Sequence, residues 1–282
     1  MTAASEVYNY RRHSLSMGGT LKVLFPGAYG NTYLNNFKMT LDTTAVGNLV
    51  MRNGSGNLGI EYSGSSNPIN DIGQNLIGGP KGVAFDLGLV YQFKHKDRNG
   101  YIVKLGASLL DVGSVRFNSN QATSRQFVIN SSATVNPSTI GGSDFDAIIA
   151  NLKSSGAVSE IPADSSFSVN LPMAYNFLAD VNVWKSFYVT MNLQRRASDV
   201  TNPRNILGAN YFTVTPRFVT RFFEAYVPFS FSEIQGNTIG AGMKLGPLYL
   251  GSSSIISALG STNKAVDFHF GIRSGFGKQT NK

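Results

Sequence analysis

Apolar side chains occupy every second position over long stretches of this chain. The segment SFSVNLPMAYNFLADVNVWKSFYVTMNLQRR (166–196) has apolar residues at nearly all odd positions and Asn, Asp, Gln and Arg at many even ones. An alternation of period two is typical of a β-strand with one apolar and one polar face. The residues Trp184-Lys185-Ser186 interrupt it, so the segment predicts a hairpin whose two strands share one apolar face.

The same alternation recurs along the chain and predicts about eleven strands. A turn at Asn99-Gly100 separates two of them, Gly246-Pro247 separates two others, and a change of phase near Phe223-Glu224 indicates a tight turn or a bulge. The predicted strands cover residues 15–25, 37–41, 83–93, 101–109, 167–183, 187–193, 212–222, 225–231, 239–245, 248–250 and 266–272.

Short and long connections alternate from residue 83 onward. In an up-and-down meander every second connection lies at the same end, so this order predicts tight turns at one rim and long loops at the other, as in outer-membrane barrels. The longest insert, 119–165, contains a short helix predicted over 143–154, where Ser143 and Asp146 form a capping-box pattern. This helix either packs on the barrel mouth or acts as a lid or plug.

Alternation alone does not separate a membrane barrel from a soluble lipocalin-like barrel, whose apolar face points inward. Three features favour the membrane: strands of roughly 9–11 residues or more, apolar faces rich in Phe and Leu with aromatics near strand ends, and polar faces rich in Gly, Asn and Thr. We therefore predict an all-β, antiparallel, up-and-down transmembrane β-barrel. No run approaches 18 consecutive apolar residues, which excludes a transmembrane helix.

The net charge of +8 does not indicate nucleic-acid binding, because Lys and Arg are spread over strand faces and turns instead of forming one basic stripe with stacking aromatics. In a barrel, the polar phase of each strand points into the lumen, where charges either tune selectivity or pair and close the interior. The predicted lumen-lining residues are Lys22, Lys38, Asp42, Asp86, Lys104, Asn176, Asp180, Arg217, Arg221, Glu224, Lys244, Asp267, His269 and Arg273.

Motifs for catalysis are weak. The absence of Cys excludes disulfides and thiolate chemistry, and the stretch Gly54 to Gly59 fits G-x-G-x-x-G without a following helix pattern, so it predicts a turn. The three histidines are scattered, which argues against a metal site. His269 shares a polar face with Asp267 and Arg273, a grouping that a membrane-barrel hydrolase would use, but a polar lumen cluster explains it as well. We predict no enzyme activity, no catalytic residue, no metal and no cofactor.

Six segments of the chain resemble a known family. They are LSMGGTLKVLFPGAYG (15–30), GPKGVAFDLGLVYQF (79–93), VKLGASLLDVGSVRF (103–117), FSVNLPMAYNFLADVNVWKSFYVTMNLQ (167–194), VTPRFVTRFFEAYVPFS (214–230) and GAGMKLGPLYLGSSSIIS (240–257). They are similar to an uncharacterised family of Bacteroidota outer-membrane β-barrel proteins, which are sometimes fused to OmpA-like peptidoglycan-binding domains and are distantly similar to barrels of the FadL and PorV type. The resemblance implies an outer-membrane location and contact with its lipid.

Two functions follow as hypotheses. The first is a passive channel or transporter for small polar or amphipathic solutes. The second is a non-conducting barrel that anchors, or is an accessory to, an envelope or secretion-system assembly.

The chain start lacks the features of a signal peptide, and family members carry one together with additional upstream strands. We therefore expect residues 1–282 to be the C-terminal part of a larger barrel domain. We expect the strand at 15–25 to run inward from an extracellular start and one edge of the sheet to stay open.

Overall fold

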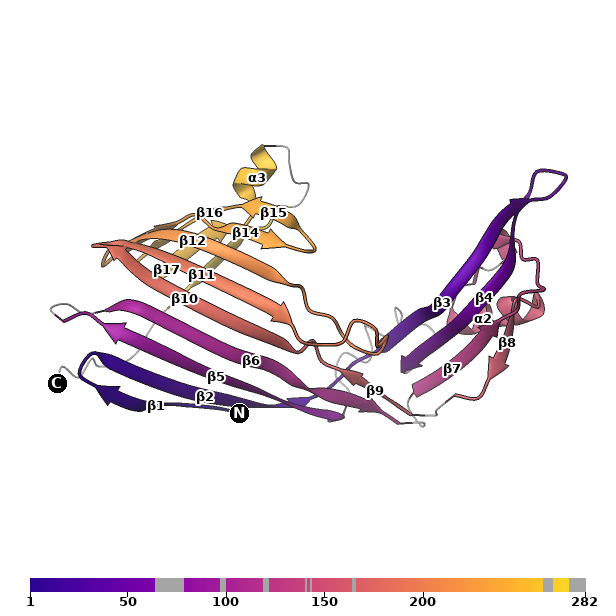
Figure 1. Cartoon of the computed structure of the whole chain (residues 1–282), viewed down its shortest axis with the longest axis horizontal. Coiled ribbons are helices and arrows are strands. Elements are labelled where there is room, and N and C mark those ends of the chain that lie inside the picture. Colours follow the sequence, from indigo (N-terminus) through magenta and orange to yellow (C-terminus); the bar gives the residue numbers. More distant parts are fainter. Residues whose placement is uncertain are drawn as a thin grey trace.

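The computed structural model describes residues 1–63, 79–96, 100–118, 122–139, 141–142, 144–163, 166–260 and 266–273. Within them the chain forms two antiparallel β-sheets and three short helices (Figure 1). The predicted all-β, up-and-down architecture is confirmed, although the larger sheet is not closed into a cylinder.

The larger sheet has fourteen strands. They are β1 (Thr2–Tyr10), β2 (His13–Leu24), β5 (Gly82–Lys94), β6 (Tyr101–Phe117), β9 (Phe167–Asn170), β10 (Ala174–Trp184), β11 (Phe187–Arg196), β12 (Tyr211–Val219), β13 (Phe223–Tyr226), β14 (Phe229–Ser232), β15 (Gly236–Ile239), β16 (Ala241–Leu245), β17 (Leu248–Ser252) and β18 (His269–Ile272). Their spatial order is β1-β2-β5-β6-β10-β11-β12-β13-β16-β17-β18, with β9 on β6 and with β14 between β12 and β15.

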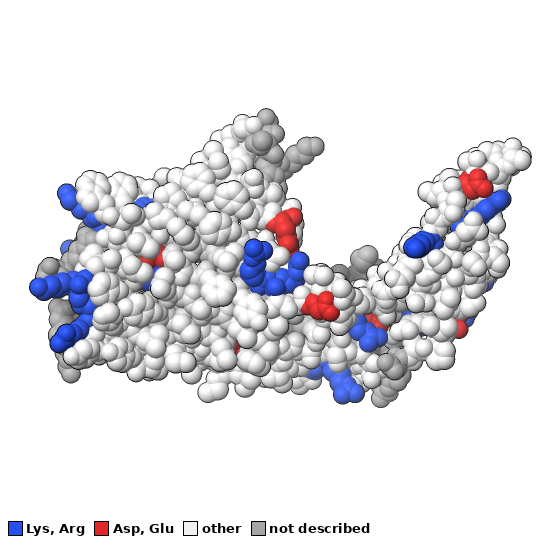
Figure 2. All heavy atoms as spheres, in the orientation of Figure 1, with Lys and Arg blue, Asp and Glu red and all other residues white. Residues whose placement is uncertain are grey.

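Tight turns gather at one end of this sheet, as the alternation of short and long connections predicts. The turns at 11–12 and 185–186 have Arg11 and Lys185 at positive φ, 54° and 41°, the backbone region that two-residue hairpin turns require. Exposed basic residues gather at the same end, where Figure 2 shows a group of Lys and Arg side chains. They include Arg11, Lys96, Lys185 and Arg221.

The edge strands of the larger sheet differ from the prediction in one respect. Among the described residues, β1 pairs only with β2 and β18 only with β17, so the expected open edge is present. The strand predicted at 15–25 does not, however, begin at the end with the long connections. It belongs to β2, which follows β1 through the tight turn at 11–12, so it runs in the opposite direction from that predicted. The error arose because the segment 37–41 was assigned to the same sheet.

A smaller sheet accounts for that segment. Its four strands are β3 (Tyr29–Thr43), β4 (Leu49–Ser63), β7 (Ala122–Ile129) and β8 (Val158–Ile161), in that order. The hairpin β3–β4 is inserted between β2 and β5, and β7 and β8 lie in the connection between β6 and β10. The insert at 119–165, predicted as a long loop with one short helix, also contains two strands, which complete the sheet begun by the β3–β4 hairpin.

Three short helices accompany the sheets. Helix α2 (Phe145–Ser154) confirms the helix predicted at 143–154, but the carboxylate of Asp144 caps it by accepting a hydrogen bond from Ala147 N at 2.9 Å. Ser143, the predicted cap, lies outside the described residues. The others are η1 (Pro137–Thr139) and α3 (Ile255–Leu259), which the sequence analysis missed. No helix in the described part of the chain is both long and apolar enough to cross a membrane.

Among the described residues, the larger of two buried hydrophobic clusters lies in the smaller sheet. Ile60 and Phe127 from its strands and Ile149 from α2 are almost completely buried and form one cluster. The larger sheet buries a second cluster where β9 pairs with the end of β6, formed by Phe117, Phe167 and Val169. Most of its other apolar residues are exposed, and Phe177, Leu87 and Leu21 are each about half exposed, at 50%, 55% and 51%. The two sheets thus differ, because the smaller one covers its apolar face with a core that includes α2, whereas the larger one leaves most of its apolar face exposed.

Candidate functional site

The larger sheet has one polar and one apolar face. In β5, the exposed residues Phe85, Leu87 and Leu89 alternate with the less exposed Asp86 and Gly88. Side chains from strands that are not neighbours in the sheet meet on the polar face, which identifies it as the concave side. This face is the candidate functional site.

An ion-pair cluster on the polar face joins five strands. Arg217 of β12 donates from Nη2 to Asp180 Oδ2 at 2.6 Å and from Nη1 to Glu224 Oε1 at 2.8 Å. Asp180 also accepts from the hydroxyl of Tyr101 at 2.5 Å and from that of Thr190 at 3.2 Å. The side chain of Asp180 is only 8% exposed. A buried carboxylate needs such partners, so Arg217 holds this part of the sheet together.

A second cluster lies on β2, β5 and β6. Lys22 Nζ is 2.8 Å from Asp86 Oδ1 and 2.6 Å from Asp111 Oδ1. Asp111 has a positive φ of 56° and donates its backbone N–H to Asp86 at 2.8 Å. Its position in β6 coincides with a register shift opposite Asp86. A β-bulge of this kind re-aims a side chain, and here it turns Asp111 toward Lys22.

Four other predicted residues lie on or beside the polar face. Lys104 Nζ is 5.8 Å from the centre of the Tyr101 ring, a cation–π distance, and Asn176 pairs in register with Ser108. Lys244 lies opposite Glu224 across the β13–β16 pair. The ring of His269 is 3.3 Å from the hydroxyl of Tyr226.

Arg273 directly follows β18, where its backbone N–H donates to the carbonyl of the turn residue Pro247. Three other predicted residues do not share the polar face. Lys38 and Asp42 lie on β3 of the smaller sheet, where Asp42 pairs with Arg52 at 3.5 Å. Arg221 is exposed in the turn at 220–222, with its guanidinium over Phe222. Alternation alone placed them in the lumen, because it cannot tell which sheet a strand joins or where a strand ends.

Asp267 caps a serine-rich turn before α3. Its carboxylate accepts hydrogen bonds from the hydroxyls of Ser253 and Ser254, both at 2.7 Å. Burial opposes its ionisation, but these bonds outweigh burial and hold the pKa of Asp267 below its usual range. His269 Nδ1 is 3.7 Å from the same carboxylate. The two serine hydroxyls therefore donate to the carboxylate of Asp267, which has a structural role as the cap of this turn.

Glu61 and Arg204 form an ion pair that connects the two sheets. The sequence patterns did not predict this pair. Glu61 of β4 has no exposed surface, and its Oε1 accepts from Arg204 Nη2 at 2.6 Å and Nε at 2.8 Å. Nearby, the rings of Tyr29 and Phe117 stack at 5.2 Å between centres. The sequence signal was an acidic residue within the apolar run at 58–62, which is unfavourable unless it has a partner.

Glu160 of β8 fastens α2 to the smaller sheet. It accepts from Arg125 Nε at 2.8 Å and from Lys153 Nζ of α2 at 2.7 Å. The Arg125 hydrogen bond, followed by that of Lys153, lowers the pKa of Glu160 from 4.5 to about 2.

Acidification should therefore weaken the attachment of α2. A depressed carboxyl pKa contributes stability that is complete above the unfolded value of 4.5 and is lost as the pH falls through about 2. We expect the urea midpoint of the smaller sheet to fall as the pH is lowered from 4.5 to about 2. Circular dichroism measures this midpoint. Glu160→Gln should lower the midpoint at neutral pH and remove this part of the pH dependence. Glu6→Gln, on exposed β1, serves as the control and should leave it unchanged. An identical pH profile in Glu160→Gln and the unmodified protein would contradict the assignment.

Within the described residues, no group of three His, Asp or Glu side chains is arranged to hold a metal ion. The segment Gly54 to Gly59, predicted as a turn, lies within strand β4, where Gly56 has a φ of 125°. Here glycine permits an irregular strand.

One of the comparisons with known proteins gives a match. A model described as a family of unknown function, DUF5723, matches residues 2–253. The chain belongs to this family. No curated protein and no solved structure matches it. Membership of DUF5723 supplies no catalytic or binding residues, so the function must be argued from the two sheets themselves.

Proposed function

We propose that this protein is part of an integral outer-membrane β-barrel whose polar face lines a passage for small polar or amphipathic solutes. The observation that carries the proposal is the exposed apolar face of the larger sheet, which continues from β2 through β17. In water so large an apolar surface is unfavourable, whereas in a bilayer it matches the hydrocarbon. Strands β2, β5, β10 and β11 have 12, 13, 11 and 10 residues, enough to cross a membrane when tilted.

The opposite face supports a polar passage. A depression of about 440 Å³ lies over β1, β2, β5, β6 and β10. Its lining combines the small or polar residues Ser16, Gly18, Gly88, Ser108 and Asn176 with apolar residues such as Leu89 and Leu178, which suits an amphipathic solute. Small side chains leave room beside the sheet, and the ion pairs on either side provide polar contacts for a solute. The surface of this sheet that is visible in Figure 2 is largely uncharged between its ends.

One observation favours the second hypothesis, a non-conducting anchor. The charges of Lys22, Asp86, Asp180, Arg217 and Glu224 are all paired with one another or with Asp111. Paired charges neutralise the interior and tie strands together, as a structural barrel requires. In that case the smaller sheet would be the docking surface for an envelope or secretion partner.

Planar-bilayer recording of the full chain separates these functions. Discrete conductance steps support the passage, and Asn176→Lys should then shift ion selectivity toward anions because it adds a cation to the polar face. Insertion without conductance would favour the anchor, and failure to insert would refute both.

The facing of β10 gives a direct test of membrane insertion. Phe177 is 50% exposed on the apolar face and its neighbour Asn176 lies on the polar face. Placing Lys on the lipid face near the bilayer midplane costs about 2–4 kcal/mol, whereas a polar-face Lys costs little. Phe177→Lys should therefore strongly weaken folding into lipid vesicles in a urea titration, while Asn176→Lys should change it slightly.

The same titration without vesicles is the control for the membrane itself. A soluble sheet would fold to the same extent with and without lipid, and that result would refute the proposal. Equal losses in the two Lys variants would show instead that the two faces are assigned incorrectly.

A further inference from the structure

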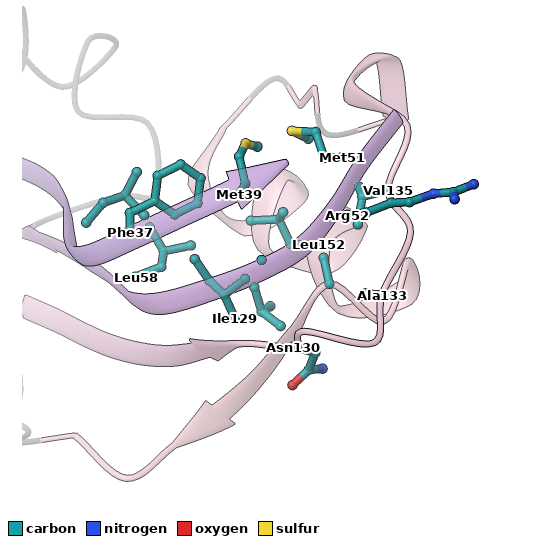
Figure 3. A pocket seen from close by; sticks show the side chains of 14 residues that line it. Phe37, Met39, Met51, Arg52, Leu58, Ile129, Asn130, Ala133, Val135 and Leu152 are labelled. Atoms are coloured by element: carbon teal, nitrogen blue, oxygen red, sulfur yellow. The ribbon is translucent and has the colours of Figure 1, made fainter. Parts of the chain in front are cut away.

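A pocket in the smaller sheet is separate from the polar face of the larger one. It has a volume of about 280 Å³ and lies between β3–β4, α2 and the segment after β7 (Figure 3). Its lining includes Leu34, Phe37, Met39, Leu58, Ile129 and Leu152. The volume of the pocket is close to the lower end of the range for small-molecule pockets, about 300–1,000 Å³.

The pocket wall is apolar on all sides. Figure 3 shows the guanidinium of Arg52 and the amide of Asn130, the polar side chains among those labelled, directed away from the other lining residues. Gly54 leaves bare backbone in the wall, since a Cβ there would lie 2.8 Å from Ile129 Cγ2. The cavity therefore suits a hydrocarbon group and offers no charge or hydrogen-bonding side chain to a polar one.

An irregularity in β3 builds this wall. The pairing of β3 with β4 shifts register between Asn35 and Lys38, where Asn36 has a φ of 52°. In a regular strand, Leu34 and Phe37 would point to opposite faces, because they are three positions apart. The bulge instead brings both to the pocket. Bulges that re-aim side chains are features of functional sites.

The lining residues also expose apolar surface to solvent. Leu34 is 50% and Phe37 41% exposed, although the smaller sheet has its own buried core and does not need them outside. Such a surface is stabilised when a ligand covers it. The side chains that line the pocket extend along strands β3 and β4, from Phe37 at one end to Val135 at the other (Figure 3). The pocket is therefore elongated. Two methionines in the lining add adaptable walls.

We propose that this pocket binds the unbranched hydrocarbon chain of a free amphipathic small molecule, with its polar end left in water. An apolar cavity of about 150 Å³ holds one benzene, so the pocket accommodates a chain of roughly ten carbons. The inference is independent of solute passage along the larger sheet, because the pocket lies wholly within the smaller one.

Photolabelling of the full chain in lipid vesicles tests the proposal. The probe is 1-decanol carrying a diazirine near its chain end, and peptide mass mapping locates the label. We expect labelling of residues 34–58 and 129–158 that unlabelled 1-decanol competes away. Label confined to strands of the larger sheet would overturn the proposal.

Two variants and a control make the test specific. Ala133→Trp fills the pocket and should reduce its labelling at least about tenfold, equivalent to about 1.4 kcal/mol of binding free energy. Val46→Trp adds the same side chain at an 82% exposed position on the same hairpin and should not change it. Met39→Ala enlarges the pocket, so 1-dodecanol should gain on 1-decanol as competitor even if the Trp variant fails to fold. Labelling that is insensitive to both pocket variants would overturn the proposal.

A membrane acyl chain is the other source of the same chemistry. Vesicles containing phosphatidylcholine with a diazirine on one acyl chain provide this arm. We expect that lipid to label the larger sheet and leave the pocket at background. Pocket labelling as strong as that from the decanol probe would replace the free amphipath with membrane lipid as the occupant.

Discussion

Replacing Arg217 by Met should lower the free energy of unfolding by about 3–5 kcal/mol, the cost of removing one partner from a buried ion pair. The residue pairs with Asp180 at 2.6 Å and with Glu224 at 2.8 Å, and both carboxylates are largely buried, at 8% and 20% exposure. Without the guanidinium, the negative charges of Asp180 and Glu224 oppose each other across the polar face. Urea titration of the full chain in vesicles measures the loss.

Two further variants separate this pairing from a general effect of losing an arginine. Arg221→Met removes an exposed arginine four positions away and should stay within about 0.5 kcal/mol of the unmodified protein. Combining Arg217→Met with Asp180→Asn should cost less than the sum of the single changes, because each removes the same interaction. Additive losses would show that the pair is not coupled.

Replacing Arg204 by Leu should release the smaller sheet from the larger one. Glu61 is completely buried and receives two hydrogen bonds from Arg204, so the variant leaves a carboxylate in the core of β4. The expected loss is about 3–5 kcal/mol, and we expect it to appear as faster hydrogen exchange in β4 and β7. The larger sheet should keep its protection.

The double variant Glu61→Leu/Arg204→Leu is the informative comparison. Apolar residues of similar volume often replace a buried pair without loss, so exchange in β4 and β7 should return most of the way to that of the unmodified protein. A double variant as labile as Arg204→Leu would mean that Arg204 acts through its other contacts, such as its position over the ring of Phe167.

Period-two alternation predicted the larger sheet because one of its faces is mainly apolar and the other mainly polar. Strands β5, β6 and β11 were placed correctly, since most of their apolar residues lie on one continuous face. The strand predicted over 167–183 is instead divided into β9 and β10. The same rule placed Asp86, Asp180 and Arg217 on the polar face. It could not show that Lys22 meets Asp111, because a bulge moved Asp111 out of the apolar phase of its strand.

The smaller sheet was missed for a different physical reason. Its central strand β4 is apolar on one side only over residues 58–62, and its partner β7 lies in a segment rich in Ser, Thr and Asn. Local patterning is weak there, and the strands are specified by packing on α2 and by Glu61 with Arg204. Contacts between distant segments leave little trace in a local window of sequence.

The order of insertion along the chain has a consequence for folding. Strand β4 ends at Ser63 and its partner β7 begins at Ala122, and the β5–β6 hairpin lies between them. Bringing β4 to β7 directly would close a loop of nearly sixty residues, whereas a formed β5–β6 hairpin returns the chain to nearly the same point and shortens the effective loop. The hairpin should therefore precede the smaller sheet in time. The β5–β6 hairpin of the larger sheet therefore assembles first and brings the two halves of the smaller sheet to each other.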